Sequence, residues 1–201
     1  LITFIGIPPF IATYGMLWIA EGWALILMKA EIIYGFSPQF RFIGAGYIMD
    51  IPFPIILMIV VSVIMLFILY RTIFGRSIYA LGANPSSAII SGVKHKRLQI
   101  LCYTLSGGFA AISGIIYVSR MNAAEAGVGS PMLLLALAAV VMGGNSLLGG
   151  EGGILRTVIG AIIIALVQNM LNLMGIHPYW QNFVLGVILI AAVTGDLLRT
   201  K

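Results

Sequence analysis

Few side chains of this 201-residue sequence could do acid–base or nucleophilic chemistry. Glu21 interrupts an apolar run, and it lies about two helical turns from Lys29. A carboxylate in a membrane span is a functional hypothesis, and a snorkelling or locally paired side chain is the alternative. His177, an isolated loop histidine, and Cys102, the single cysteine, complete neither a nucleophile–base pair nor a metal-ligand motif. We therefore expect no catalytic site and no metal site.

The glycine-rich segment 143–153 could be mistaken for a phosphate-binding loop. It lacks the Gly-Lys-Ser/Thr ending of such a loop and does not follow the strand of a soluble domain. We expect a tight turn between spans, with glycines that allow positive φ and close backbone packing. The chain itself therefore shows no nucleotide site, and we expect no cofactor.

Three uncharged amides, Gln168, Asn169 and Asn172, lie near the end of a long apolar segment. Positions 168 and 172 share one helix face, and 169 lies near 172. Amides in a span must find partners in other helices or in a watery cavity. They either connect helices or line a pathway for a polar solute, and their spacing leaves both open.

Segment 71–97 is a basic island between two apolar blocks and holds five of the eleven Lys and Arg residues. Within it, Asn84 followed by Pro85 predicts a helix N-cap and first helical position. Ser86 to Ser91 supplies about two turns, and Gly92 can end them. A short helix at the membrane surface is suited to docking a soluble partner. The alternative is an ordinary cytoplasmic loop with a helical turn.

The elements that position these groups are predicted to be membrane helices. The chain is 61% hydrophobic and 8% charged, with a mean hydropathy of +1.10, whereas a soluble domain is about a quarter charged. A net charge of +5 would suggest nucleic acid in a soluble chain. Here the basic residues cluster beside apolar spans, which indicates a lipid bilayer and no nucleic-acid partner. The expected fold class is all-α, as a polytopic membrane protein.

Six apolar segments are separated by polar or glycine-rich breaks: 10–28, 53–70, 98–118, 131–142, 154–174 and 183–194. Segment 131–142 is either a fourth span or a shorter buried helix. Segment 29–52 carries glycines and prolines that disfavour a persistent helix, so we predict an extramembrane loop with at most a short surface element. Residue 1 is Leu within an apolar run, so the sequence looks like a fragment that lacks its natural N-terminal part.

The charge distribution predicts the orientation of the spans. If segment 71–97 is cytoplasmic, eight Lys and Arg residues lie inside, and Lys29, Arg41 and Arg120 lie outside. Loops 29–52, 119–130 and 175–180 then face outward. Packed spans without a catalytic constellation favour transport, and an ion-driven carrier would place more ionisable groups at mid-membrane. The simpler hypothesis is that a separate protein supplies the energy for transport and docks on the cytoplasmic island.

Four stretches resemble the membrane permeases of bacterial ABC importers for ribose and related sugars. They are Pro9–Met16 (PFIATYGM), Gly75–Asn84 (GRSIYALGAN), Ala138–Gly152 (AAVVMGGNSLLGGEG) and Gln168–Gly175 (QNMLNLMG). Their order and spacing are similar to those of the family, and they cover almost the whole chain.

The resemblance implies the C-terminal six spans of a permease with about ten, in the bacterial inner membrane. Residues 1–201 would form a single transmembrane permease domain with a cytoplasmic coupling loop, 71–97. The implied partners are a second permease copy, cytoplasmic ATP-binding subunits, and a periplasmic or extracellular sugar-binding protein. ATP hydrolysis would belong to the separate subunits, so the permease itself would be no enzyme.

The resemblance also implies roles for individual residues. It places the coupling helix in 84–93, which agrees with the docking helix expected from capping and charge. The expected contacts to the ATP-binding subunits are Gly82, Asn84, Pro85, Ser86, Ser87, Ala88, Ile89, Ser91 and Gly92. Candidates for the translocation pathway are Thr13, Gln168, Asn169 and Asn172. Arg41 and Arg120 are candidates for pairing with acids on the binding protein.

The sequence departs from the family's pattern at two places. Glu21 stands where the family commonly has Arg, and Met132 to Leu135 stand where many sugar permeases have acidic residues. Pentoses, hexoses, autoinducer-like furanosyl compounds and nucleosides therefore all stay open as substrates. A permease for branched-chain amino acids is a rival hypothesis, but segment 78–82 favours a sugar permease over it. An ion-driven secondary carrier and a membrane scaffold are the further alternatives.

Overall fold

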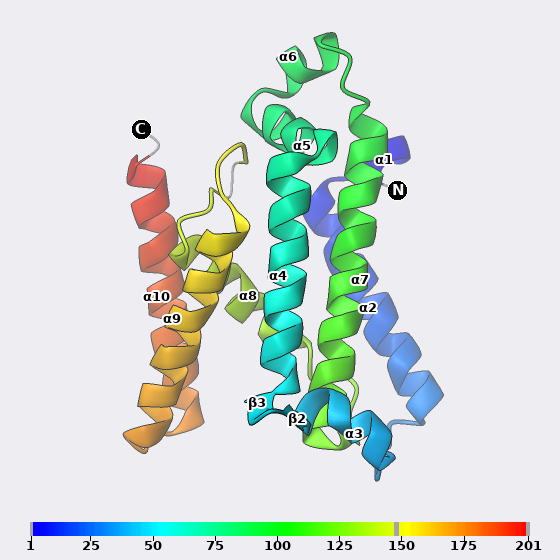
Figure 1. The fold of residues 1–201 in the computed structure, drawn as a ribbon, viewed down its shortest axis with the longest axis vertical. Helices are drawn as coiled ribbons and strands as arrows, with labels where there is room; N and C mark the ends of the chain where they lie inside the picture. Colours follow the sequence, from blue (N-terminus) through cyan, green and yellow to red (C-terminus); the bar gives the residue numbers. More distant parts are fainter. Residues whose placement is uncertain (1, 147–148, 200–201) are drawn as a thin grey trace. The chain divides into compact units, whose positions relative to one another are not determined.

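The computed structural model describes residues 2–146 and 149–199, most of them in helices (Figure 1). The helices are α1 (Ile2–Ile5), α2 (Pro9–Met28), α3 (Pro38–Ala45), α4 (Phe53–Arg71), α5 (Ile73–Ala83), α6 (Pro85–Ile90), α7 (His95–Met121), α8 (Ser130–Met142), α9 (Ile154–Leu173) and α10 (Pro178–Arg199). Two-residue strands form two antiparallel pairs, β1 (Ile33–Tyr34) with β4 (Ala123–Ala124) and β2 (Tyr47–Ile48) with β3 (Ile51–Pro52). The predicted all-α class is confirmed.

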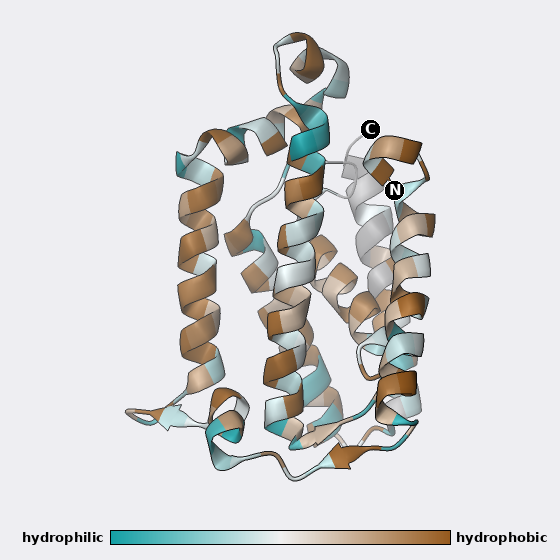
Figure 2. Ribbon diagram, turned by 90° about the vertical axis from the view of Figure 1, so that its right-hand side faces the viewer, coloured by the Kyte–Doolittle hydropathy of each residue, from teal (hydrophilic) through white to brown (hydrophobic). Residues whose placement is uncertain are grey.

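Within the described part of the chain, four helices are long and apolar enough to cross a membrane: α2, α4, α7 and α9. In Figure 2, α4 at the left is hydrophobic along most of its length. Helix α8 has 13 residues and is about 20 Å long, which favours the shorter helix over a fourth span. Helix α10 has 22 residues and extends beyond the predicted 183–194 at both ends. The chain is therefore a polytopic membrane protein.

The basic island is more helical than predicted. Helix α5 was not expected, because only 86–91 was assigned to a helix there. Thr72 starts α5, since its hydroxyl oxygen accepts a hydrogen bond from the Gly75 amide at 3.3 Å. Lys201, which the predicted orientation counted as an inner charge, lies outside the described residues.

The chain divides into two compact units. One comprises Leu1–Val60 and Lys94–Gly129, and the other comprises Val61–Val93 and Ser130–Lys201. The single domain 1–201 stays a prediction.

In the first unit, α3 packs on the C-terminal end of α7 (Figure 1). The contact centres on Ser119, which is 0% exposed. Its hydroxyl oxygen accepts a hydrogen bond from the Gly44 amide at 2.7 Å, and the hydroxyl donates to the Phe40 carbonyl at 2.6 Å. A side chain at Gly44 would overlap the backbone of Arg120. The two helices therefore meet backbone to backbone, with one hydroxyl between them.

In the second unit, α8, α9 and α10 pack around a small apolar core. Ala138, Ala139 and Ile164 are buried there, and Leu185 of α10 packs against them. A Cβ atom at Gly160 would overlap the carbonyl oxygen of Ala139. Helices α8 and α9 are therefore in direct backbone contact, which is how small residues hold membrane helices together.

We expect Ser119→Ala to destabilise the first unit. The substitution leaves the Gly44 amide and the Phe40 carbonyl without their buried partner, and we expect a cost of about 2 kcal/mol. A lower unfolding temperature of the full-length protein in detergent would show this cost. Ser106→Ala is the matched control, because Ser106 lies exposed on the same helix. Equal unfolding temperatures for the two variants would contradict the assignment.

Candidate functional site

Helices α5 and α6 meet at a corner that consists of one residue, Asn84. Its amide donates to the Ala80 carbonyl at 3.1 Å and thereby ends α5. Its side-chain oxygen accepts from the Ser87 amide at 3.1 Å and thereby starts α6. Pro85 occupies the first helical position. The predicted N-cap and proline start are confirmed, and the same residue also closes the preceding helix.

Helix α6 is a short helix with most of its surface exposed. Among the residues of α6 only Ala88 is buried, and Ile90 is 87% exposed. The helix ends at Ile90 with Ser91 as its C-cap, and the following Gly92, whose φ is +87°, turns the chain away as predicted. The predicted contact residues Ser86, Ser87 and Ile89 all lie on the exposed surface. The segment thus presents hydroxyl groups and an apolar tip.

Helix α5 lies directly against the glycine-rich segment. A Cβ atom at Gly82 would overlap the backbone nitrogen of Gly150, so the two backbones touch. One turn earlier, the Tyr79 hydroxyl donates to the Gly152 carbonyl at 2.8 Å. The pKa of the Tyr79 phenol is raised above its ordinary value. Burial is the larger cause, and the neighbouring Tyr70 adds to it. The phenol therefore stays protonated and remains a donor near neutral pH.

The glycine-rich segment is tied to the start of α9 by Asn145, a buried polar residue. The Asn145 side-chain nitrogen donates to the Val140 carbonyl at 2.8 Å and to the Thr157 hydroxyl at 3.1 Å. The Asn145 side-chain oxygen accepts from the Gly153 amide at 2.7 Å. These bonds join the end of α8 to the start of α9. The expected tight turn is confirmed over its described residues.

Helices α8, α9 and α10 enclose a cavity of about 330 Å³. Gln168 of α9 and Asn182 of α10 are its amide groups, and the remaining lining is apolar: Pro131, Leu134, Leu135, Ala138, Leu185 and Gly186. Neither amide is hydrogen-bonded to another residue in the described ranges. Leu134 and Leu135 of α8 make this wall of the cavity apolar.

The other pathway candidates are not brought to this cavity. The Asn172 side-chain oxygen accepts from the Gln181 side-chain nitrogen at 2.9 Å, so this amide connects α9 to α10. Asn169 is exposed on α9 and is not among the lining residues. Thr13 belongs to the other unit, and its hydroxyl donates to the Pro9 carbonyl of its own helix at 2.9 Å. Of the four candidates, Gln168 alone lines the cavity.

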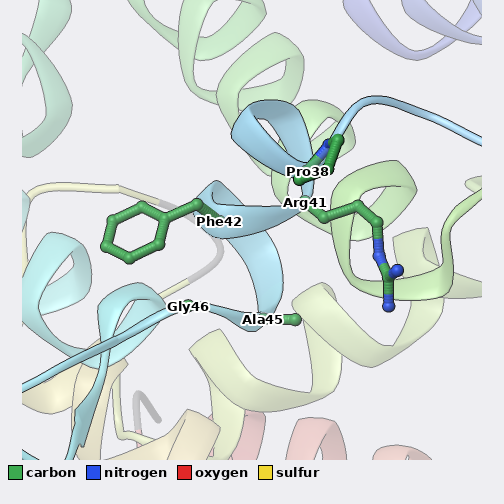
Figure 3. A pocket seen from close by; sticks show the side chains of 5 residues that line it. All are labelled: Pro38, Arg41, Phe42, Ala45 and Gly46. Carbon is green, nitrogen blue, oxygen red and sulfur yellow. The ribbon is translucent and has the colours of Figure 1, made fainter.

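Arg41 and Arg120 lie at the same end of the first unit. Arg41 lines a shallow pocket of about 260 Å³ on α3, where its side chain points away from that of Phe42 (Figure 3). Arg120 is exposed at the last turn of α7, beside the buried Ser119. Ser119 fastens α3 to this end of α7, and Arg41 and Arg120 each neighbour one of the residues in that contact, Phe40 and Ser119.

Glu21 lies against the loop that follows α7. A Cβ atom at Gly127 would come within 2.8 Å of its carboxylate oxygen Oε1. Glu21 is half-buried there. The carboxylate thus contacts another segment of the chain, which fits a locally paired side chain better than a free ionisable group.

Sequence reasoning missed four residues that build these sites: Tyr79, Asn145, Asn182 and Ser119. Tyr79 and Asn145 lie inside the quoted motifs, so their position offered a signal. Ser119 offered a weaker one, as a polar residue between an apolar run and Arg120. Asn182 offered none, because its role depends on the packing of α10 against α8 and α9.

Comparisons with known proteins give one family and several relatives. A family model described as branched-chain amino acid transport system / permease component matches residues 1–193. The chain is 40% identical over 190 residues to a ribose import permease protein of Bacillus subtilis (strain 168), covering 94% of this chain and 59% of the relative. It is 37% identical over 201 residues to a D-allose transport system permease protein of Escherichia coli (strain K12), covering 100% and 62%. No solved structure matches.

The chain therefore spans about three-fifths of the length of the curated relatives that it matches.

Replacing Asn84 tests the corner between α5 and α6. We expect Asn84→Ala to destabilise α6 by about 1 kcal/mol, because the Ser87 amide loses its acceptor. Hydrogen exchange of the Ser87 amide in the full-length protein should become roughly fivefold faster. Asn84→Asp keeps a side-chain acceptor and should exchange like the wild type. Equal exchange in Asn84→Ala would show that the cap does not hold the helix.

Proposed function

This chain belongs to the permease family described as branched-chain amino acid transport system / permease component, and we propose that it is the membrane-spanning part of an ATP-driven importer for ribose or a related monosaccharide. The protein would act in the bacterial inner membrane, with ATP hydrolysis on separate subunits. The observation that carries the proposal is the exposed helix α6, whose first turn is capped by Asn84.

The relatives favour a sugar as the solute. The family description names branched-chain amino acids, whereas the two relatives reported above are named for ribose import and for D-allose transport. Permeases for autoinducer-like compounds, nucleosides or branched-chain amino acids would present the same docking helix. The cavity beside Gln168 and Asn182 offers carboxamides, which exchange hydrogen bonds with hydroxyl groups.

Helix α6 has the surface that a soluble partner requires. Ile89 and Ile90 are exposed apolar groups beside exposed hydroxyls, a combination that fits a complementary groove on another protein. The basic residues that follow at the start of α7 suit a cytoplasmic membrane surface with anionic lipids. We propose that the ATP-binding subunits dock here, through the exposed members of the expected contact set: Asn84, Pro85, Ser86, Ser87, Ile89, Ser91 and Gly92. The other two expected residues face the chain itself, since Ala88 is buried and Gly82 lies against Gly150.

The transport cycle then follows from a two-state permease. ATP-driven closure of the ATP-binding subunits would push on α6 and shift two permease copies between outward-open and inward-open states.

On the other side, a sugar-binding protein would deliver its solute at the surface that carries Arg41 and Arg120. Guanidinium groups there can pair with carboxylates of the binding protein and orient it. The whole assembly would contain one such surface on each permease copy.

Charge placed in α6 tests the docking site. We expect Ser87→Arg to abolish both co-purification of the ATP-binding subunits and uptake of radiolabelled ribose in cells that carry the full-length gene and its operon partners. The bulky cation would occupy the exposed docking face. Ser87→Ala is the control and should retain both activities, because the Ser87 side chain makes no bond that the N-cap needs.

Each outcome separates a part of the proposal. If Ser87→Arg loses the ATP-binding subunits but even the wild type takes up no ribose, the coupling to ATP-binding subunits stands and ribose is rejected as the solute. Uptake that persists with no ATP-binding subunit bound would reject the coupled importer in favour of a carrier.

The cavity between α8, α9 and α10 is tested by Gln168→Leu. We expect ribose uptake to fall while co-purification of the ATP-binding subunits is unchanged, because the substitution removes one of the two carboxamides from the lining. Asn169→Leu, one position along the same helix and outside the cavity, is the matched control. Equal uptake by the two variants would show that the cavity lies off the pathway.

A further inference from the structure

The corner at Asn84 leaves α5 and α6 little freedom to move separately. One residue ends the first helix and starts the second, through hydrogen bonds of 3.1 Å on each side. A displacement of α6 is therefore passed to α5, rather than absorbed by a flexible linker. The contacts of α5 determine which element receives this displacement.

Near its C-terminal end α5 contacts the glycine-rich turn directly, backbone against backbone. At Gly82 and Gly150 the two backbones touch, and a Cβ atom on either glycine would overlap the other segment. The Tyr79 hydroxyl adds a directional bond to the Gly152 carbonyl at 2.8 Å. Closely packed groups have discrete arrangements and transmit displacement.

Asn145 then divides the connection between two helices. One side chain reaches the Val140 carbonyl in α8, the Thr157 hydroxyl in α9 and the Gly153 amide between them. Further along, Gly160 holds α9 against α8. Gln168, in the cavity lining, lies eleven residues after Thr157, which is about 16 Å along the same helix.

We propose that Tyr79 and Asn145 are positioning residues of the transport cycle, which carry a displacement of α6 through the glycine-rich turn into α8 and α9 and so to the cavity at Gln168. This inference rests on the proposed function, since it takes docking of ATP-binding subunits on α6 as the source of the displacement. The solute does not touch either residue. Their role is to make ATP binding change the accessibility of the cavity.

The experiment uses a single-cysteine reporter in the full-length permease, assembled with its ATP-binding subunits in lipid vesicles. Cys102→Ala removes the cysteine of the described chain, and Gln168→Cys places one in the cavity lining. The rate of labelling by N-ethylmaleimide is measured with and without ATP. We expect ATP to change this rate several-fold in the reporter background.

Tyr79→Phe, added to the reporter, removes one hydroxyl group and retains the ring. We expect co-purification of the ATP-binding subunits to stay at the reporter's level, while the effect of ATP on labelling disappears. Thr157→Val, which deletes the acceptor of Asn145, should do the same at the next step. Ser77→Ala is the control on α5, because among the described residues its hydroxyl bonds only to the Ile73 carbonyl of the same helix, at 2.8 Å.

The outcomes separate this inference from the function on which it rests. A reporter permease that binds no ATP-binding subunit would overturn the proposed function, and this inference with it. A permease that binds them, but whose labelling ignores ATP or responds equally in Tyr79→Phe, would overturn this inference alone. Loss of the bound subunits in both Tyr79→Phe and Thr157→Val would assign these residues to folding and equally overturn it.

Discussion

The interior of a bilayer offers the backbone no hydrogen bonds, so each helix end in such a chain must reach the surface or be closed by the protein itself. This constraint explains where the polar side chains lie. Ser37, Thr72 and Asn84 each accept a bond from the first turn of a helix. Asn145 satisfies the turn between α8 and α9. These four polar side chains therefore lie at helix ends and at the turn between two helices, where backbone groups need partners.

Local signals made part of this structure predictable. Asn84 and Pro85 predicted the start of α6 because capping depends on neighbours in the sequence. Helix α5 was not predicted, and it contains two residues of low helix propensity, Gly75 and Gly82. Both glycines are required by packing, since a Cβ atom would overlap Leu69 at the first position and Gly150 at the second. Sequence propensity and tertiary packing conflict here, and packing decides.

The candidate site shows the same division between local and distant information. Gln168 and Asn172 have the same chemistry and share a helix face, so the sequence left their roles open. Their roles differ because of α10, where Gln181 binds Asn172 and Asn182 joins Gln168 at the cavity. The sequence linked Arg41 to Arg120 only because the predicted topology places both of their loops on the outer side. Ser119, which unites their helices, became recognisable only from the packing of α3.

The shared cap at Asn84 also limits how this region can change in evolution and in engineering. A residue inserted or deleted at the corner would separate the two functions of one side chain, leaving either the end of α5 or the start of α6 open. The length of this junction is thus constrained more tightly than its chemistry. A chimaeric permease that exchanges α6 for that of another transporter would have to place its splice points outside the corner and keep the asparagine.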